Sequence, residues 1–226
     1  AMRRSIFSSE KSMELMRDHF KPGITEQELW SRFQMEAVSR GAEWIETRLL
    51  ASGPRANPWY QECSSRPILS GELMGFDTDL VGSYGYCTDM SRTWLCGDEK
   101  PTDEQKEIYT MGYEQIQNNM ELLKPGTTFK ELTLNSKEYS KDEFRHYSVL
   151  FHGVGLCDEF PAIPFSWELN ENSFDGVLQP GMVMCVETYV GRYSGGPGVK
   201  LEEQVLITES GYELLTSYPF EKDLLS

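Results

Sequence analysis

The sequence predicts an α+β domain assembled from two similar halves. Amphipathic helical segments alternate with apolar strand segments along the chain. The pattern K-P-G-x-T-x-x-E-L occurs twice, at residues 21–29 and again at residues 124–132. Each copy follows an amphipathic helix, and each half then ends in two strands that carry carboxylates, over residues 73–96 and 182–208. These observations favour a helix–helix–strand–strand unit that occurs twice.

The repeated pattern has two explanations. Two helix starts can share it because the same capping chemistry suits both. Alternatively, the unit is duplicated, and a pseudo-twofold axis then relates two halves with a site where their sheets meet. The chain has 226 residues, which is long enough to bury a substantial core in one domain. We expect a single domain over residues 1–226, with halves at about 8–98 and 99–215 and no accessory domain before it.

Composition narrows the classes of partner. The formal net charge of −15 argues against nucleic acid, because few basic groups are available to neutralise phosphates. No apolar run approaches the roughly 20 residues needed to span a bilayer, so no membrane partner is expected. The first residues lack the apolar stretch of a signal peptide. Five scattered cysteines without a CxxC pair favour free thiols, and therefore a cytoplasmic protein.

The first half is expected to open with two helices. Apolar residues recur on one stripe over residues 8–20, and Pro22-Gly23 interrupts that helix. Thr25 and Glu28 then form a capping box, in which each side chain bonds the backbone of the other residue. The helix that follows is expected to bury Leu29, Trp30, Phe33 and Ala37 and to end at Gly41.

A loop rich in glycine, proline and serine is expected over residues 52–71, followed by two strands around a turn over residues 73–96. Thr102 and Gln105 then open a second long helix with the same capping chemistry. Its apolar stripe consists of Tyr109, Tyr113, Ile116, Met120 and Leu123.

The first strand pair carries three carboxylates that suggest a metal site. Asp77 and Asp79 are two residues apart, so a strand would direct both side chains to the same face. Asp89 lies on the returning strand. Buried carboxylates need a partner of opposite charge, and closely spaced acids without one repel each other. A bound metal ion would supply that charge.

The second half offers complementary ligands. Glu187 ends an apolar strand, Glu202 lies at the centre of the next strand, and His152 stands beside two glycines. Any one of these acids alone could form a structural ion pair. As a set, oxygen ligands with one imidazole suit one or two divalent ions, of which iron, manganese, cobalt and zinc are the candidates.

Four sequence blocks resemble signatures of the pita-bread metallohydrolases, the family of methionine aminopeptidase, aminopeptidase P, prolidase and creatinase. They are GYCTDMSRT at 85–93, FHGVG at 151–155, LQPGMVMCVE at 178–187 and GVKLEE at 198–203. The resemblance covers nearly the whole chain in the family's order and implies the pita-bread fold. It also implies a dinuclear metal site whose five ligands are Asp79, Asp89, His152, Glu187 and Glu202.

The chain departs from the peptidases of that family in its histidines. Those peptidases use one histidine before the first metal aspartate, one in the motif H-G-x-G-H, and one slightly further on. Here Trp59 stands at the first position, Leu156 at the second, and residues 157–161 hold no histidine. Peptide hydrolysis by the usual mechanism is therefore not expected.

The spacing of the acids is similar to that of the dimethylsulfoniopropionate lyase branch of the family. Asp77 precedes Asp79, and Asp79 and Asp89 are closer together than in the peptidases. This resemblance implies Asp77 as a sixth ligand, iron as the metal, Asp158 as the catalytic base and a homodimer. Its small substrate carries a sulfonium cation, which favours aromatic faces. The candidate substrate-binding residues are Trp59, Tyr60 and Tyr147, with Phe160 and Trp167 as further aromatic candidates.

Three functions remain open at this point. The first is a metal-dependent lyase that forms dimethyl sulfide and acrylate by β-elimination. The second is an Xaa-Pro dipeptidase or aminopeptidase, against which the missing histidines count. The third is a non-catalytic binding module of the same fold, although such a module would not need a complete ligand set.

Overall fold

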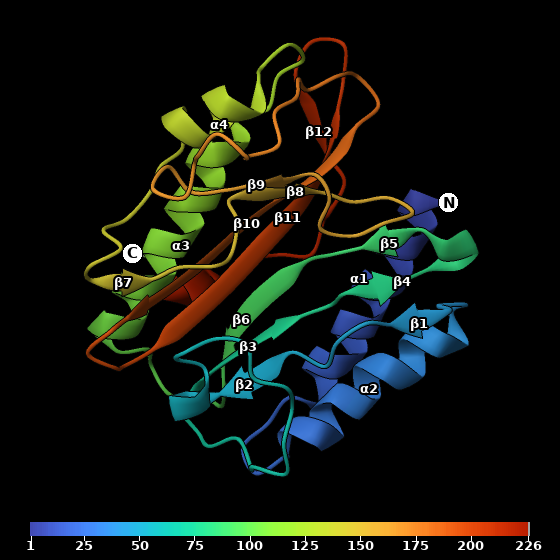
Figure 1. The fold of residues 1–226 in the computed structure, drawn as a ribbon. Coiled ribbons are helices and arrows are strands. Elements are labelled where there is room, and N and C mark those ends of the chain that lie inside the picture. Colours follow the sequence, from blue (N-terminus) through green and yellow to red (C-terminus); the bar gives the residue numbers. More distant parts are fainter. Residues whose placement is uncertain (226) are drawn as a thin grey trace.

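The computed structural model describes residues 1–225, which form an α+β structure in which helices flank the sheets (Figure 1). The helices are α1 (Met2–His19), α2 (Glu26–Ser39), α3 (Asp103–Met120) and α4 (Phe129–Asn135). The strands of the first half are β1 (Trp44–Ile45), β2 (Leu50–Ser52), β3 (Leu73–Asp77), β4 (Leu80–Val81), β5 (Cys87–Thr88) and β6 (Ser91–Leu95). Those of the second half are β7 (Phe144–Arg145), β8 (Phe151–Gly153), β9 (Ala162–Ile163), β10 (Val183–Arg192), β11 (Gly198–Ile207) and β12 (Tyr212–Leu214). Short 3₁₀ turns lie at Gly53–Arg55, Ser83–Gly85 and Lys222–Leu224.

Helix α1 begins at Met2, so the prediction of a start near residue 8 was wrong. The missed first turns bury Ile6 next to Ser5, and one buried apolar residue is too few to establish a helical period. Further serines, Ser8, Ser9 and Ser12, are buried on the following turns. The Ser12 hydroxyl donates to the Ser8 carbonyl at 2.7 Å, which satisfies it inside the helix. Ser5 lies so close to Gly82 that a side chain at position 82 would collide with it.

The two copies of the repeated pattern fold alike. Gly23 and Gly126 both have φ of +91°, a left-handed conformation that suits glycine. The Gly23 N–H donates to the Ile68 carbonyl at 2.8 Å, and the Gly126 N–H donates to the Leu178 carbonyl at 2.8 Å. Both following helices have complete capping boxes. These equivalent hydrogen bonds favour duplication over coincidence.

The strand pair expected over residues 73–96 is divided between two sheets. Strands β3 and β6 pair in a sheet of order β2-β3-β6, whereas β4 and β5 join β1 in a separate small sheet. Strand β3 ends at Asp77, and two residues later the φ of +37° at Asp79 is incompatible with a continuing strand. This break places the acidic segment between the two sheets.

The second half contains the larger sheet, of order β12-β11-β10-β8-β9, with β7 also paired to β10. Strands β10 and β11 form a long antiparallel ladder from Val183↔Leu206 to Gly191↔Gly198. Together they match the strands expected over residues 182–208.

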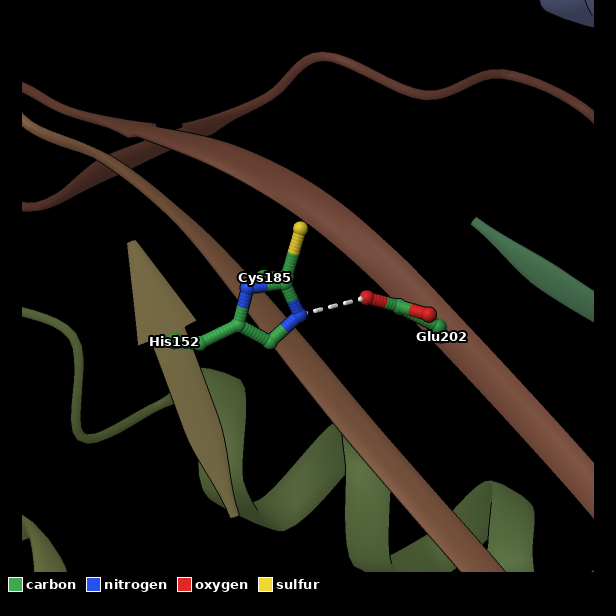
Figure 2. A group of neighbouring side chains, drawn as sticks. All are labelled: His152, Cys185 and Glu202. Atoms are coloured by element: carbon green, nitrogen blue, oxygen red, sulfur yellow. Dashed lines mark hydrogen bonds and ion pairs between the residues drawn. The ribbon is translucent and has the colours of Figure 1, made fainter. Parts of the chain in front are cut away.

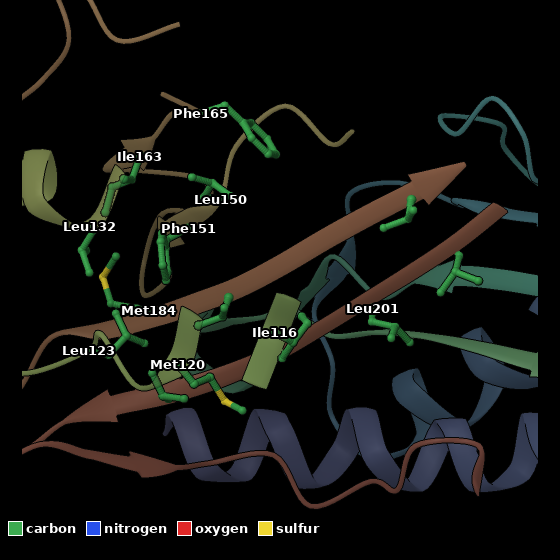
Figure 3. Close-up of a cluster of buried hydrophobic side chains, with 14 of the residues drawn as sticks. Ile116, Met120, Leu123, Leu132, Leu150, Phe151, Ile163, Phe165, Met184 and Leu201 are labelled. Carbon is green, nitrogen blue, oxygen red and sulfur yellow. The ribbon is translucent and has the colours of Figure 1, made fainter. Parts of the chain in front are cut away.

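Each half has its own hydrophobic core. In the second half, Ile116 and Met120 of α3 lie in one buried cluster with Met184 of β10 and Leu201 of β11 (Figure 3). The first-half cluster gathers apolar side chains of α1, α2, β3 and β6, including Met13. Strand β11 also contacts β3 and β6. The strand faces that do not meet the helices are therefore free to hold the polar residues.

Among residues 1–225, no helix is both long enough and apolar enough to cross a lipid bilayer.

Candidate metal centre

The long β10–β11 ladder carries the second-half ligands on one face. Glu187 and Glu202 are directly opposite each other. Alternation along the strands puts Cys185 and Lys200 on that same face, two residues from these glutamates. Leu201 points the other way and joins the core. The face of β11 opposite Lys200 and Glu202 is apolar except for Glu203, which pairs with Arg92 at 2.8 Å.

The first half contributes three aspartates at points where strands end. Asp77 ends β3, Asp79 follows it and accepts a hydrogen bond from the Thr47 hydroxyl, and Asp89 precedes β6. The Asp79 N–H donates to Asp89 Oδ1 at 3.3 Å, which ties the two segments together. Carboxylate oxygens of Asp77, Asp79 and Asp89 all lie within 4.8 Å of one another.

His152 links the two groups of carboxylates. It lies on β8, is fully buried, and pairs with Cys185 in the β8–β10 ladder. Its Nε2 lies 3.1 Å from Glu202 Oε1 (Figure 2). It also lies 3.5 Å from Glu187 Oε1. The same nitrogen lies 3.9 Å from Asp89 Oδ2. All six sequence-predicted ligands therefore gather in one cluster between the two halves.

Lys200 is a member of this cluster that the sequence reasoning missed. Its ammonium nitrogen lies 3.1 Å from Asp77, 2.7 Å from Glu187 and 3.0 Å from Glu202, and the side chain is fully buried. The Tyr147 ring covers it at 4.2 Å from nitrogen to ring centroid. The sequence shows only that Lys200 lies two residues before Glu202, so strand alternation directs both side chains to the same face.

Burial and crowding shift the ionisation of these groups. Burial raises the pKa of Asp79, Asp89 and Glu187 well above the usual carboxylate value, and the charge of Asp77 adds to the shift for the two aspartates. Burial acts to lower the pKa of Lys200, but the surrounding carboxylates outweigh it and raise that pKa well above its usual value. The ammonium group therefore remains charged inside the cluster.

His152 and Glu202 form a coupled pair. Burial acts to lower the pKa of His152, but its hydrogen bond to Glu202 and the nearby carboxylates raise it to about 10. Burial acts to raise the pKa of Glu202, but the charge of Lys200 and the bond to His152 hold it below its usual value. Without a metal ion, the cluster thus retains a proton on the imidazole.

The residues present fit a divalent metal ion. Glu187 Oε1 is a buried oxygen without a hydrogen-bond donor, and such an oxygen is costly unless a cation binds it. Asp77 Oδ2 also lacks a hydrogen-bond donor, although the Lys200 ammonium lies 3.1 Å from it. Carboxylates of Asp77, Glu187 and Glu202 lie within 4.8 Å of one another, as do ligand atoms of Asp89, His152 and Asp158. A mostly oxygen donor set with one imidazole suits iron, manganese, cobalt or zinc.

Asp158 lies beside the cluster in the loop after β8. Its Oδ1 is 3.6 Å from His152 Nδ1, and the side chain is 6% exposed. Burial raises the pKa of Asp158 to about 7, against the opposing charge of His152. The Glu159 N–H donates to Asp158 Oδ1 at 3.0 Å and fixes its orientation. A carboxyl group with this pKa can accept or donate a proton near neutrality.

Two of the aromatic candidates come together over the site. Tyr60 stacks on Tyr147 with ring centroids 5.3 Å apart and an interplanar angle of 25°. Tyr60 is 54% exposed whereas Tyr147 is buried, so Tyr60 offers the accessible ring. Trp59 is buried and stacks on Tyr189 at 6.0 Å, in one apolar cluster with Tyr147. Trp59 therefore belongs to the buried packing around Tyr147 and does not line an open surface.

The two remaining aromatic candidates pack elsewhere. Phe160 is exposed and lies 5.2 Å from Phe174, measured between ring centroids. Trp167 stacks on Phe165 at 4.8 Å and also contacts His146. These contacts belong to the second-half surface and core, so neither ring joins the Tyr60–Tyr147 pair.

Comparison with known proteins agrees with this geometry. The sequence model of metallopeptidase family M24 matches residues 1–209. The chain belongs to metallopeptidase family M24. Proteins of this family bind divalent metal ions, so the gathered carboxylates and histidine form the candidate M24 metal centre.

Two curated relatives in family M24 are similar over the whole chain. The dimethylsulfoniopropionate lyase DddP of Roseovarius nubinhibens is 47% identical over 232 residues, which cover 100% of this chain and 52% of the relative. The enzyme of the same name from Roseobacter denitrificans is 47% identical over 233 residues, again with 100% and 52% coverage. The chain therefore spans about half the length of these relatives.

Solved structures of M24 peptidases share the fold. The prolidase of Pyrococcus furiosus superimposes with a TM-score of 0.81 at 31% identity, covering 96% of this chain and 62% of that one. The X-Pro aminopeptidase of Thermotoga maritima gives a TM-score of 0.82 at 27% identity, with 96% and 60% coverage. The predicted pita-bread fold is thereby confirmed.

Proposed function

We propose that this M24 protein is a metal-dependent lyase that cleaves dimethylsulfoniopropionate, or a similar small cationic acid, to dimethyl sulfide and acrylate. The observation that carries the proposal is the 47% identity to two dimethylsulfoniopropionate lyases across the entire chain. The complete set of gathered acids, with Asp158 beside His152, supports the same reaction.

The reaction requires a base and a site for the substrate carboxylate. Asp158 removes a proton from the carbon next to the carboxylate, and its pKa of about 7 suits that role. The electrons of the broken C–H bond form the C=C bond, and those of the C–S bond leave with neutral dimethyl sulfide. A divalent metal ion supplies Lewis acidity toward the substrate carboxylate when bound. Asp77, Asp79, Asp89, His152, Glu187 and Glu202 would hold it, with iron as the proposed metal.

The stacked pair of Tyr60 and Tyr147 suits the sulfonium group, which is the positively charged end of the substrate. A sulfonium cation gains roughly 0.5–2 kcal/mol from each aromatic face that it contacts. Tyr60 presents an accessible ring stacked on Tyr147, directly beside the metal centre. We extend the proposal to a small-molecule substrate and a cytoplasmic homodimer, as in the sequence-based expectation.

Xaa-Pro peptide hydrolysis is the alternative, favoured by the likeness to prolidase. The described histidines weigh against it. Only His152 lies in the cluster, whereas His146 packs on Phe165 and Trp167, and His19 bonds the Leu15 carbonyl within α1. A peptidase mechanism would therefore have to work with no second imidazole near the metal.

Headspace gas analysis tests the proposal. Purified protein loaded with Fe(II) should release dimethyl sulfide from dimethylsulfoniopropionate. Asp158→Ala and the isosteric Asp158→Asn should lower the rate at least about 100-fold while metal content stays unchanged. The exposed Asp175→Asn serves as the matched control and should keep the wild-type rate. Cleavage of Xaa-Pro dipeptides with no release of dimethyl sulfide would replace the lyase by the peptidase.

A further inference from the structure

Cys185 is a buried thiol on the metal-facing side of β10. It precedes Glu187 by two residues on the strand, so both side chains point to the same face. Its register partners are His152 on β8 and Gln204 on β11. The Cys185 sulfur and ligand atoms of His152 and Glu202 all lie within 4.8 Å of one another (Figure 2).

The protein offers this thiol little other polar contact. The thiol donates a long hydrogen bond to the Asp89 backbone carbonyl, with the sulfur 3.8 Å from the oxygen. Gln204, its neighbour on β11, already accepts from the Thr88 hydroxyl at 3.0 Å. On its other side Cys185 packs with Val154 in a small apolar cluster. The sulfur thus lies at the boundary between an apolar wall and the carboxylates.

A second observation points to a ligand at this position. Glu187 Oε1 is buried without a hydrogen-bond donor, in a side chain that is only 1% exposed. It lies 3.5 Å from His152 Nε2, on the same strand face as Cys185. The Cys185 sulfur, the His152 imidazole and a Glu202 carboxylate oxygen form a mixed donor set. The unsatisfied Glu187 oxygen lies beside the same imidazole. Such a set suits a divalent ion better than it suits water alone.

We propose that Cys185 is an additional metal ligand, which shares one ion with His152 and Glu202. This inference rests on the metal centre proposed above. On binding, the S–H bond breaks, the proton passes to solvent, and a sulfur lone pair forms the bond to the ion; no electron is transferred. Bonds of about 2.0–2.3 Å to nitrogen, oxygen and sulfur require only a modest closing of the present spacing. The soft sulfur donor would favour zinc, cobalt and iron over magnesium and manganese.

Anaerobic titration of metal-free protein with Co(II) tests this proposal. Bound Co(II) gives visible ligand-field absorption, and a thiolate ligand adds a charge-transfer band in the near ultraviolet. Wild-type protein should show both. Cys185→Ser should retain the visible absorption and lose the near-ultraviolet band. Cys157→Ser, which removes the exposed thiol beside Asp158, should keep both bands.

The possible outcomes test separately whether Cys185 is a ligand and whether the metal centre exists. Visible absorption without the charge-transfer band in wild-type protein would overturn Cys185 as a ligand and leave the metal centre in place. A band that persists in Cys185→Ser would also overturn it. Complete absence of Co(II) absorption in folded wild-type protein would remove the metal centre and this inference together. Cys185→Ala, checked by circular dichroism, distinguishes loss of the ligand from loss of the fold.

Discussion

Glu187 and Glu202 face each other across the β10–β11 ladder, and both side chains are almost completely buried. Like charges directly opposite on neighbouring strands destabilise a sheet, and burial increases that cost. The Lys200 ammonium lies 2.7 Å from one glutamate and 3.0 Å from the other. The sheet therefore holds two buried acids that require positive charge nearby. A bound metal ion would supply such charge.

Removal of one glutamate should release the metal. Glu202→Gln keeps the shape of the side chain but loses an anionic ligand, so metal affinity should fall at least about 10-fold. The control is Glu213→Gln, since Glu213 is exposed and pairs with Arg3 at 2.8 Å. Metal content after dialysis, measured by elemental analysis, checks the result. Equal metal content in both variants would exclude Glu202 as a ligand.

Lys200 should contribute to stability mainly in the metal-free protein. Lys200→Met leaves Asp77, Glu187 and Glu202 without their buried cation, and such a loss costs roughly 3–5 kcal/mol of unfolding free energy. Lys137→Met removes an exposed pair with Glu114 and should cost less than about 1 kcal/mol.

Urea unfolding of chelated protein measures both variants. Saturating metal should restore more stability to Lys200→Met than to wild type, because the ion replaces the missing charge. If the two lysine substitutions cost the same, Lys200 would not be compensating the buried acids.

The metal-free protein should lose stability as the pH rises from about 6.5 to about 10. The native-state pKa of His152 is raised to about 10 from 6.5, so the native state holds the proton more tightly than the unfolded chain. Its contribution is complete below pH 6.5 and disappears through pH 10. Because a metal ion must displace this proton, apparent metal affinity should rise over the same window.

Unfolding midpoints and metal titrations at several pH values check both trends. In His152→Asn the pH dependence of stability over this window should weaken. A metal affinity that is constant between pH 6.5 and pH 9 would show that His152 does not bind the ion.

The sequence predicted that these residues are candidate ligands because strand alternation and residue type single them out individually. Asp77, Asp79 and Glu187 interrupt apolar strands, where carboxylates are rare. Lys200 escaped the same reasoning because a strand lysine is usually solvent-exposed, and only the three-dimensional cluster reveals its burial. Cys185 was read as a scattered free thiol for the same reason.

Other parts of the fold could not be predicted from the sequence, for two physical reasons. Strands β1, β4 and β5 have two residues each, too few for a period of two to be recognised. Trp59 was predicted to contact substrate, yet its ring is buried against Tyr189, and no local pattern specifies which face of a loop residue packs inward.

Tyr60 should determine substrate affinity rather than the chemical step. Its accessible ring stacks on Tyr147 and is the proposed contact of the sulfonium, whereas Asp158, beside His152, is the proposed base. Tyr60→Ala should raise KM for dimethylsulfoniopropionate about 2- to 30-fold, which corresponds to roughly 0.5–2 kcal/mol of cation–π energy. Tyr60→Phe preserves the aromatic face and should keep KM close to wild type.

Steady-state kinetics of both variants, with Tyr193→Ala as an exposed tyrosine control, provides the comparison. An equal rise in KM for Phe and Ala would instead assign the affinity to the Tyr60 hydroxyl, and a loss of kcat alone would place Tyr60 in the chemistry.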